Sequence, residues 1–395
     1  SFVGGVGRPM NVADPVPAEP LEVEIAALDE RLPLEPLNRE LDARPRLPAE
    51  LFREMGRAGL LGLTVPTELG GRGLSPVRAA RVLYRLAQRG GTLAAKLSLQ
   101  PEFCSVLGSL GRTEHQRESY RQLLAGERLI GNQITEPGAG SDLRALSASV
   151  ELDGSVARIS GTKSQAAFAV DATEAIVLLR TPVGTDSALG AWLVPQDRPG
   201  IERVVIDDHG ERWMRRGTVT YHRLELPAEA QIGEPRAAMS ALRAELLRER
   251  GLLAAIYLGV ARRSWEETVA FTGSRRTFGA PLAERQAISF PLAEDWVRLD
   301  SAWRQVEAVT RRLEDGTATE AETAMLKWHA GEVALTALEH AVQFHGGAGY
   351  SAELPHERRL RDVRSARIAH GTAEIAHRIA TRALWPAESR AGKDF

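Results

Sequence analysis

GNQITEPGAGSDL (Gly131–Leu143) lies where a helical sequence pattern gives way to short β-prone runs. Its proline and glycines predict an irregular loop with exposed backbone N–H groups, and Thr135 and Ser141 add hydroxyl donors. Such a loop can hold a polar planar ring or a phosphate. On composition alone, an ordinary linker between two domains is the more common interpretation.

Upstream of this stretch the pattern is helical. Apolar residues recur at three- and four-residue spacing between about residues 21 and 128. Pro48 is placed to begin one helix over residues 48–63, and residues 75–91 form another that is expected to end at its glycine pair. The sequence therefore predicts an N-terminal helical domain over residues 1–128.

Downstream, short β-prone runs alternate with turn residues, and Asp153-Gly154 is a hairpin signal. The runs cover residues 147–160, 174–180, 190–195, 201–207 and 217–226. They predict a middle antiparallel β domain over residues 129–234. Long helical patterns over residues 239–271, 292–314 and 319–345 then predict a C-terminal four-helix bundle domain over residues 235–395. The fold class is α+β multidomain.

The composition excludes several classes of protein. The 395 residues are 43% hydrophobic and 26% charged, and their net charge of −2 argues against nucleic-acid or anionic-membrane partners. A single cysteine, Cys104, forms no internal disulfide and no thiolate metal site, so no metal and a cytoplasmic location are expected. No apolar run reaches membrane-spanning length. No G-x-G-x-x-G follows a predicted strand, which makes a Rossmann fold unlikely on the motif evidence.

Two further loops could contact a dinucleotide. In SRRTFGAPLAERQAISF (Ser274–Phe290), Arg275 and its neighbour precede a Phe278–Gly279 turn and could clamp a pyrophosphate. The alternative is a solvated helix end with basic side chains. In VQFHGGAGY (Val342–Tyr350), the glutamine and glycines admit close backbone approach, although a plain helix C-cap is the default interpretation.

Glu249 is the strongest candidate for acid–base chemistry. It lies on an apolar stripe of a predicted helix, formed by Leu242, Leu246, Leu253, Ile256 and Val260. A carboxylate on such a stripe faces the core or a pocket and is suited to act as a general base. The alternative is an ion pair with the adjacent Arg250, and the pattern does not choose between the two.

These segments, in this order, resemble the acyl-CoA dehydrogenase family over nearly the whole chain. The resemblance implies the same three-domain fold, a homodimer or homotetramer, and one FAD per subunit. The segments that carry it are LGLTVPTELGG, ITEPGAGSD, ISGTK, RRTFGAPLAERQAISF, VQFHGGAGY and RLRDVRSARIAHGTAEI.

The resemblance also assigns contacts to residues. Ile134, Thr135 and Ser141 match positions at the isoalloxazine ring, and Ser141 also reaches the substrate thioester. Thr372 and Glu374 match a pair that contacts the dinucleotide. A further set matches positions that reach the FAD of a neighbouring subunit: Arg275, Thr277, Phe278, Gln286, Gln343, Gly346 and Gly347.

The family's reaction is α,β-dehydrogenation of an acyl thioester, in which a carboxylate removes the Cα proton and a hydride passes to flavin N5. In most members the base is a Glu just before Gly-Thr, where this chain has His370 before Gly371. Isovaleryl- and long-chain-type members carry it on the first long helix of the C-terminal domain, one residue before an Arg, as Glu249 stands before Arg250. We therefore expect Glu249 to be the base.

The other residues at this position are expected to bind substrate. The resemblance gives the backbone N–H of His370 the task of polarising the thioester carbonyl. Its imidazole, Gly371 and Arg250 are expected to line the substrate site. A histidine is chemically able to serve as a base near neutral pH, so a His370 base stays an open alternative.

One departure bears on the electron acceptor. After ISGTK the family usually has Trp-Ile-Thr, and this chain has Gln165, Ala166 and Ala167. Loss of the threonine hydroxyl removes about 1 kcal/mol of hydrogen bonding to reduced flavin. The leading function is an FAD-dependent dehydrogenase of an acyl-CoA or acyl-carrier-protein thioester, with an acceptor such as an electron-transfer flavoprotein. The alternatives are an oxidase or monooxygenase that uses oxygen directly, and a non-enzymatic flavin-binding relative.

Overall fold

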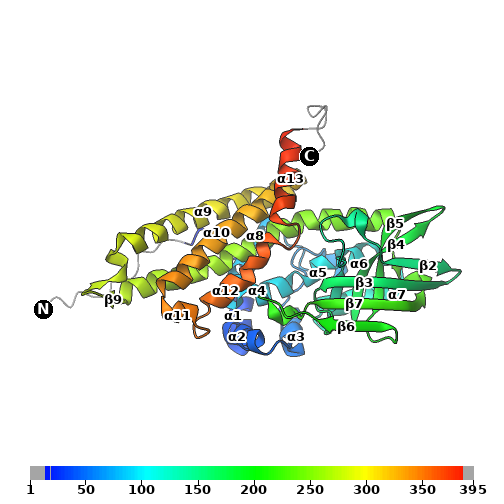
Figure 1. Cartoon of the computed structure of the whole chain (residues 1–395), viewed down its shortest axis with the longest axis horizontal. Helices are drawn as coiled ribbons and strands as arrows, with labels where there is room; N and C mark the ends of the chain where they lie inside the picture. The colour runs from blue at the N-terminus through cyan, green and yellow to red at the C-terminus, as the bar shows by residue number, and fades with distance from the viewer. Residues whose placement is uncertain (1–13, 18, 386–395) are drawn as a thin grey trace.

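A computed structural model describes residues 14–17 and 19–385 (Figure 1). The order helices, sheet, helices is confirmed. The outer parts of the expected domains, residues 1–13 and 386–395, lie outside the described residues. The domain limits at residues 128 and 234 stay predictions. The last N-terminal helix ends at residue 124 and the first strand begins at residue 130. The longest helix begins at residue 235.

The N-terminal helices are α1 (Glu22–Arg31), α2 (Leu34–Ala43), α3 (Ala49–Arg57), α4 (Pro76–Ser98), α5 (Gln100–Phe103), α6 (Ser105–Leu110) and α7 (Glu114–Leu124). The prediction that the second pattern ends at its glycine pair is confirmed in the backbone geometry, because Gly91 leaves the helical region with a φ of 63° and a ψ of −144°. A further helical stretch follows directly and runs to Ser98, so α4 consists of two helices joined at this kink. The carbonyl of Gly90 accepts a hydrogen bond of 3.0 Å from Asn38, and the residues beyond the kink are buried.

The middle of the chain forms a twisted sheet, seen at the right of Figure 1. Among the described residues it has eight strands, in the order β6-β7-β3-β2-β4-β5-β8 with β1 beside β4. They are β1 (Ile130–Gln133), β2 (Ser149–Asp153), β3 (Val156–Ala166), β4 (Glu174–Val183), β5 (Asp186–Pro195), β6 (Ile201–Val205), β7 (Gly217–Pro227) and β8 (Gln231–Ile232). The predicted hairpin joins β2 to β3. The sheet is mixed, because β1 pairs with β4 in parallel.

The C-terminal part contains α8 (Pro235–Ser274), β9 (Arg276–Thr277), β10 (Ala280–Pro281), α9 (Gln286–Glu314), α10 (Glu320–Phe344), α11 (Gly347–Tyr350), α12 (His356–Val363) and α13 (Ala373–Leu384). Helix α8 runs along the long axis of the molecule from the sheet to β9 (Figure 1). Residues 249–262 of α8 are buried on every side, which is more than the one-sided stripe in the sequence predicts.

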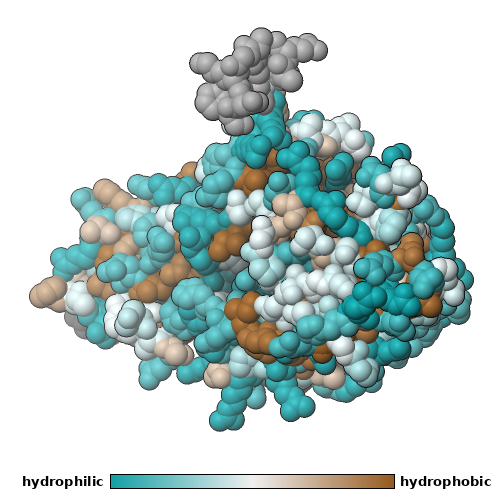
Figure 2. Space-filling view, turned by 45° about the vertical axis from the view of Figure 1, so that its right-hand side comes forward, coloured by the Kyte–Doolittle hydropathy of each residue, from teal (hydrophilic) through white to brown (hydrophobic). Residues whose placement is uncertain are grey.

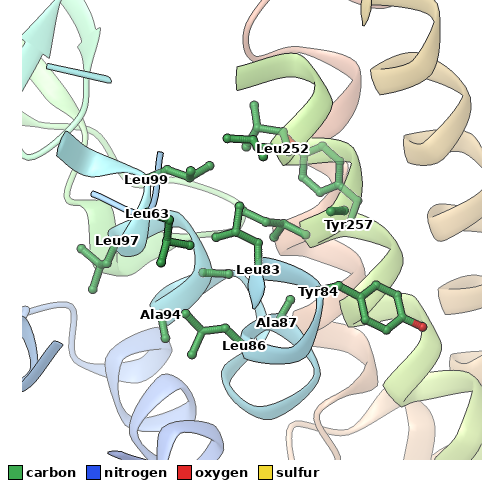
Figure 3. Close-up of a cluster of buried hydrophobic side chains, with 14 of the residues drawn as sticks. Leu63, Leu83, Tyr84, Leu86, Ala87, Ala94, Leu97, Leu99, Leu252 and Tyr257 are labelled. Carbon is green, nitrogen blue, oxygen red and sulfur yellow. The ribbon is translucent and has the colours of Figure 1, made fainter. Parts of the chain in front are cut away.

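The main core lies where α4 packs against α8 (Figure 3). Leu83 and Leu86 of α4 are fully buried, as are Leu252 and Tyr257 of α8. The two helix backbones approach closely: a Cβ at Gly259 would lie 2.4 Å from the carbonyl oxygen of Tyr84. A glycine is therefore required there, and the close packing fixes the position of α8 relative to the N-terminal helices.

Within residues 14–17 and 19–385, none of the helices combines the length and the apolar character needed to cross a membrane.

Candidate functional site

The centre of the site is a contact between the two residues that the sequence analysis singled out. Glu249 on α8 is 7% exposed, and its Oε2 lies 2.9 Å from Nδ1 of His370, in the loop before α13. The predicted base and the histidine at the usual base position thus form one hydrogen-bonded pair. The alternative of an ion pair with the adjacent arginine is not what the structure shows, since the nearest carboxylate to Arg250 is that of Glu320, at 3.5 Å.

The loop that carries His370 is held by buried cations. Arg250 Nε donates to the carbonyl of His370 at 3.1 Å. Lys327 of α10 donates to the carbonyls of Ala369 and Gly371, both at 2.5 Å. Three consecutive carbonyls are therefore each bound by a charged side chain that is almost fully buried. Hydrogen bonds from charged donors are short and strong, so this backbone is rigidly placed.

Burial shapes the titration of the groups around this pair. It raises the pKa of Glu102 on α5 to about 8. It also raises the pKa of Glu245, one turn before Glu249 on α8, to about 7, with help from the charge of Glu249. Burial, with the charges of Arg250 and Lys96, lowers the pKa of Lys327 to about 7. Glu102 is thus protonated at neutral pH and Glu245 partly so, which reduces negative charge beside Glu249.

The loop that follows β1 lies against α8. Ile134 packs in a small apolar cluster with Leu242 of α8. Thr135 is half-buried and Ser141 is exposed. The structure thus brings these predicted cofactor residues close to the helix of Glu249.

A buried ion pair fixes the same loop from the sheet side. Glu136 accepts from Lys163 Nζ at 2.8 Å, from the N–H and hydroxyl of Ser147, and from the N–H of Ala148. Lys163 also donates to the carbonyl of Ile134. Burial opposes the ionised form, but the bonds from Lys163 and Ser147 outweigh it and lower the pKa of Glu136 to about 2.

The residues that replace Trp-Ile-Thr lie beside this loop. The N–H of Ser164 donates to the carbonyl of Thr135 at 2.8 Å, which places the next three residues next to it. Gln165 is exposed and has a φ of 56°, while Ala166 is buried and Ala167 half-buried. The departure from the family pattern is therefore located at the candidate flavin loop.

Thr372 and Glu374 lie at the N-terminus of α13. Thr372 is the N-cap, and its hydroxyl accepts from the N–H of Ile375. Glu374 is exposed in the first turn. A capped helix N-terminus next to the loop of His370 presents further N–H groups, which suit a phosphate or a polar ring edge.

The other predicted cofactor residues lie at the far end of α8. The ring of His345, which follows α10, stacks on Phe271 with centroids 4.2 Å apart and joins the two segments. Arg285 donates to the carbonyl of Thr277. The side chains in this set are largely exposed: Arg275, Phe278, Gln286 and Gln343, with Gly346 and Gly347 beside them. Glu249 and Arg275 are 26 residues apart on one helix, so about 39 Å separates the two groups.

The residues present fit a flavin dinucleotide. Among the described residues, no atom lies within 4 Å of a Cβ built on Gly138, Gly346 or Gly347, so the backbone is open to a ligand there. Thr135 and Ser141 offer hydroxyls in one group, and Arg275 offers a guanidinium for phosphate in the other.

Fold and site together define a class of protein: an enzyme with an order of helices, sheet and helices, a buried carboxylate–imidazole pair among its helices, and open, donor-rich loops. Family models of acyl-CoA dehydrogenase match consecutively, the N-terminal domain over residues 28–127, the middle domain over 131–223 and the C-terminal domain over 239–385. The chain belongs to the acyl-CoA dehydrogenase family. The expected FAD cofactor, and an oxidoreductase acting on a CH–CH bond, are confirmed by this membership.

Individual relatives agree. A crystal structure assigned to an acyl-CoA dehydrogenase from Mycobacterium smegmatis is 30% identical with a TM-score of 0.86, and the match covers 92% of this chain and 96% of that one. The mitochondrial short-chain specific acyl-CoA dehydrogenase of Bos taurus is 28% identical over 86% of this chain and 83% of that protein. Subunit CarC of the caffeyl-CoA reductase–Etf complex of Acetobacterium woodii is 26% identical over 86% of this chain and 90% of that protein.

Sequence reasoning missed Lys327, Lys163 and the ring of Phe103, which stacks on His370 with centroids 5.2 Å apart. A signal for the lysines was present. The chain has 50 basic residues, and lysine occurs only at Lys96, Lys163, Lys327 and Lys393. The first three are buried.

Proposed function

We propose that this chain removes the Cα proton of an acyl thioester with Glu249 while the β-hydrogen leaves as hydride. The observation that carries the proposal is the buried carboxylate of Glu249 next to His370, at the place where the resemblance expects the base. The contact uses Oε2, so Oε1 is the oxygen that takes the proton. Bound FAD would supply the hydride acceptor, flavin N5.

The backbone around His370 would polarise the thioester carbonyl. The described residues contain no cis peptide bond, so the N–H of His370 points opposite to the carbonyl of Ala369. Lys327 holds that carbonyl and so directs the N–H away from α10. A carbonyl bound to an ammonium group also polarises its own amide, which strengthens the N–H as a donor.

The test is an anaerobic titration of the purified flavoprotein with butyryl-CoA, isovaleryl-CoA, octanoyl-CoA and the same acyl groups on a carrier protein. At least one thioester should bleach the oxidised-flavin absorbance. Glu249→Gln should abolish bleaching without loss of bound flavin. If no thioester bleaches the flavin, the dehydrogenase proposal is wrong; if the variant reacts at the wild-type rate, the base is wrongly assigned.

Two further parts of the proposal concern partners. The acyl handle is CoA or a carrier-protein phosphopantetheine, and the titration distinguishes them. The electron acceptor is an electron-transfer flavoprotein, which the similarity to a subunit of a reductase–Etf complex supports. A cytoplasmic location completes this set of proposals.

We also propose that the chain assembles as a homodimer or homotetramer. The two groups of cofactor residues lie about 39 Å apart along α8, and one FAD is too short to contact both. A second copy of the chain would bring the far group to the flavin. The far group lies among exposed apolar side chains: Phe278 is 96% and Tyr350 86% exposed. Figure 2 shows apolar surface at the left of the molecule, toward the end where α9 and β9 lie in Figure 1. Sedimentation of the holoenzyme tests the assembly.

An oxidase that uses oxygen directly is the second candidate, motivated by Ala167 in place of threonine. The comparisons favour the dehydrogenase. Slow reoxidation of substrate-reduced protein in air would exclude the oxidase. A non-enzymatic relative would show no change in any property on Glu249→Gln.

A further inference from the structure

The imidazole of His370 has a task that the backbone role of this residue does not explain. We propose that His370 is a positioning residue for Glu249: its Nδ1–H donates to Oε2 and holds the carboxylate in the orientation that presents Oε1 to the substrate. The inference rests on the proposed function, in which Glu249 is the base. It also distinguishes the two candidates for the base: Glu249 removes the proton, and His370 acts only by orienting Glu249.

The imidazole and the backbone that carries it are both held in place. One face stacks on Phe103 of α5, with an angle of 29° between the ring planes. Its own carbonyl is held by Arg250, and the carbonyls before and after it by Lys327. A donor fixed in this way loses little freedom when it binds the carboxylate, so its orienting effect is large.

Glu249 needs such a partner. Its side chain is 10% exposed and that of His370 27%, so both members of the pair are largely shielded from solvent. The neighbouring carboxyls, Glu245 and Glu102, are themselves buried. Each of them has an oxygen without a hydrogen-bond partner, so neither uses that oxygen to bind Glu249. A buried carboxylate with free torsions and no donor would be costly and poorly oriented.

The backbone supplies a matched pair of variants. His370 has a φ of 54°, in the left-handed region where most side chains are strained and glycine and asparagine are tolerated. His370→Gly removes the imidazole without adding strain. His370→Asn keeps a donor, since its amide nitrogen can take the place of Nδ1, and it removes the titrating ring.

The main test is stopped-flow flavin reduction of the holoenzymes by butyryl-CoA, or by the member of the thioester panel that reduces wild type fastest. His370→Gly should lower the limiting rate constant roughly tenfold or more, the effect of one hydrogen bond to a charged group, with little change in the half-saturating concentration. His370→Asn should stay within about threefold of wild type, because the bond is kept. Flavin content and absorbance should be unchanged in both.

Some outcomes overturn the proposal. His370→Gly at the wild-type rate shows that the imidazole positions nothing. His370→Asn as slow as His370→Gly shows that the imidazole itself, and not the hydrogen bond, is needed. Glu249→Gln at the wild-type rate refutes the proposed base instead, so the two failures are distinguishable.

A second measurement needs no substrate. The melting temperatures of wild type, His370→Gly, Glu249→Ala and the double variant form a cycle. The loss caused by His370→Gly should be smaller in the Glu249→Ala background, where the partner is gone. Additive losses would show that the two side chains do not interact and would overturn the proposal.

Discussion

Replacing Glu136 with glutamine tests how the loop after β1 is held. The substitution keeps the size of the side chain and removes its charge. It leaves the ammonium of Lys163, whose side chain is fully buried, without its anionic partner. It also weakens the bonds that the carboxylate accepts from Ser147 and Ala148. Those bonds tie the loop to the segment that leads into β2, so both the stability and the loop position should suffer.

The magnitude follows from the pKa. Bonds from Lys163 and Ser147 outweigh the opposing effect of burial and lower the pKa of Glu136 from 4.5 to about 2. At 1.36 kcal/mol per unit this corresponds to about 3 kcal/mol in favour of the folded state. Desolvation offsets part of this value, since burial lowers the pKa of Lys163 even beside Glu136, so we expect Glu136→Gln to cost about 2 kcal/mol at neutral pH.

The assay is thermal unfolding of the holoenzyme with flavin release as a second signal. Glu136→Gln should lower the melting temperature by several degrees and weaken flavin retention. The double variant Glu136→Gln/Lys163→Met should regain part of the lost stability, because it removes the unpaired buried cation as well. A Glu136→Gln variant that melts with wild type, or a double variant no better than the single one, would refute the reasoning.

The pH dependence has a definite sign. The folded pKa of Glu136 is lower than its ordinary value, so its stabilisation is fully present above pH 4.5 and is lost as the pH falls toward about 2. The stability gap between wild type and Glu136→Gln should therefore narrow below pH 4.5. A gap that stays constant down to pH 3 would contradict the assignment.

Two other buried cations give predictions of the same kind. Lys327→Met leaves two loop carbonyls without a donor, so flavin reduction should slow and the free energy of unfolding should fall by about 1–3 kcal/mol. Burial lowers the pKa of Lys327 to about 7 in the folded state, below the unfolded value of 10.5. The stability of wild type relative to Lys327→Met should therefore rise as the pH increases from 7 to 10.5. Melting curves of both proteins at these two pH values check this. Glu211→Gln leaves buried Lys96 without its partner, at 2.5 Å, and should cost about 3 kcal/mol in chemical unfolding, whereas exposed Glu202→Gln should cost almost nothing.

Much of the fold could be predicted because its signals are local. The strands alternate or carry β-branched residues, and the Asp153-Gly154 turn sets the register of β2 and β3. The glycine pair correctly marked the end of the first stretch of α4. The sequence pattern did not predict that a second helical stretch follows directly, because that stretch is stabilised by distant partners: Asn38 binds the carbonyl of Gly90, and the residues beyond the kink are buried.

The sequence predicted which residues belong to the site, but it did not predict which of them contact each other. The apolar stripe and the resemblance both pointed to Glu249, and the structure places it in the pair with His370. The bond spans 121 residues of sequence. It depends on the loop adopting a positive φ under the hold of Lys327 and Arg250, which no local pattern encodes.

The rarity of lysine in the composition indicates buried ammonium groups, and a search for motifs does not detect this. In a chain whose basic residues are almost all arginine, coding bias favours arginine wherever either residue would do. An arginine is planar and bulky, whereas an ammonium is compact and can bind several carbonyl or carboxylate oxygens in a small buried volume. Lys163 and Lys327 each do this, and Lys96 binds the carboxylate of Glu211 and the hydroxyl of Ser365. Where a chain is poor in lysine, a lysine inside an apolar segment therefore predicts a buried ammonium group, and Lys327 in the pattern over residues 319–345 satisfies that rule.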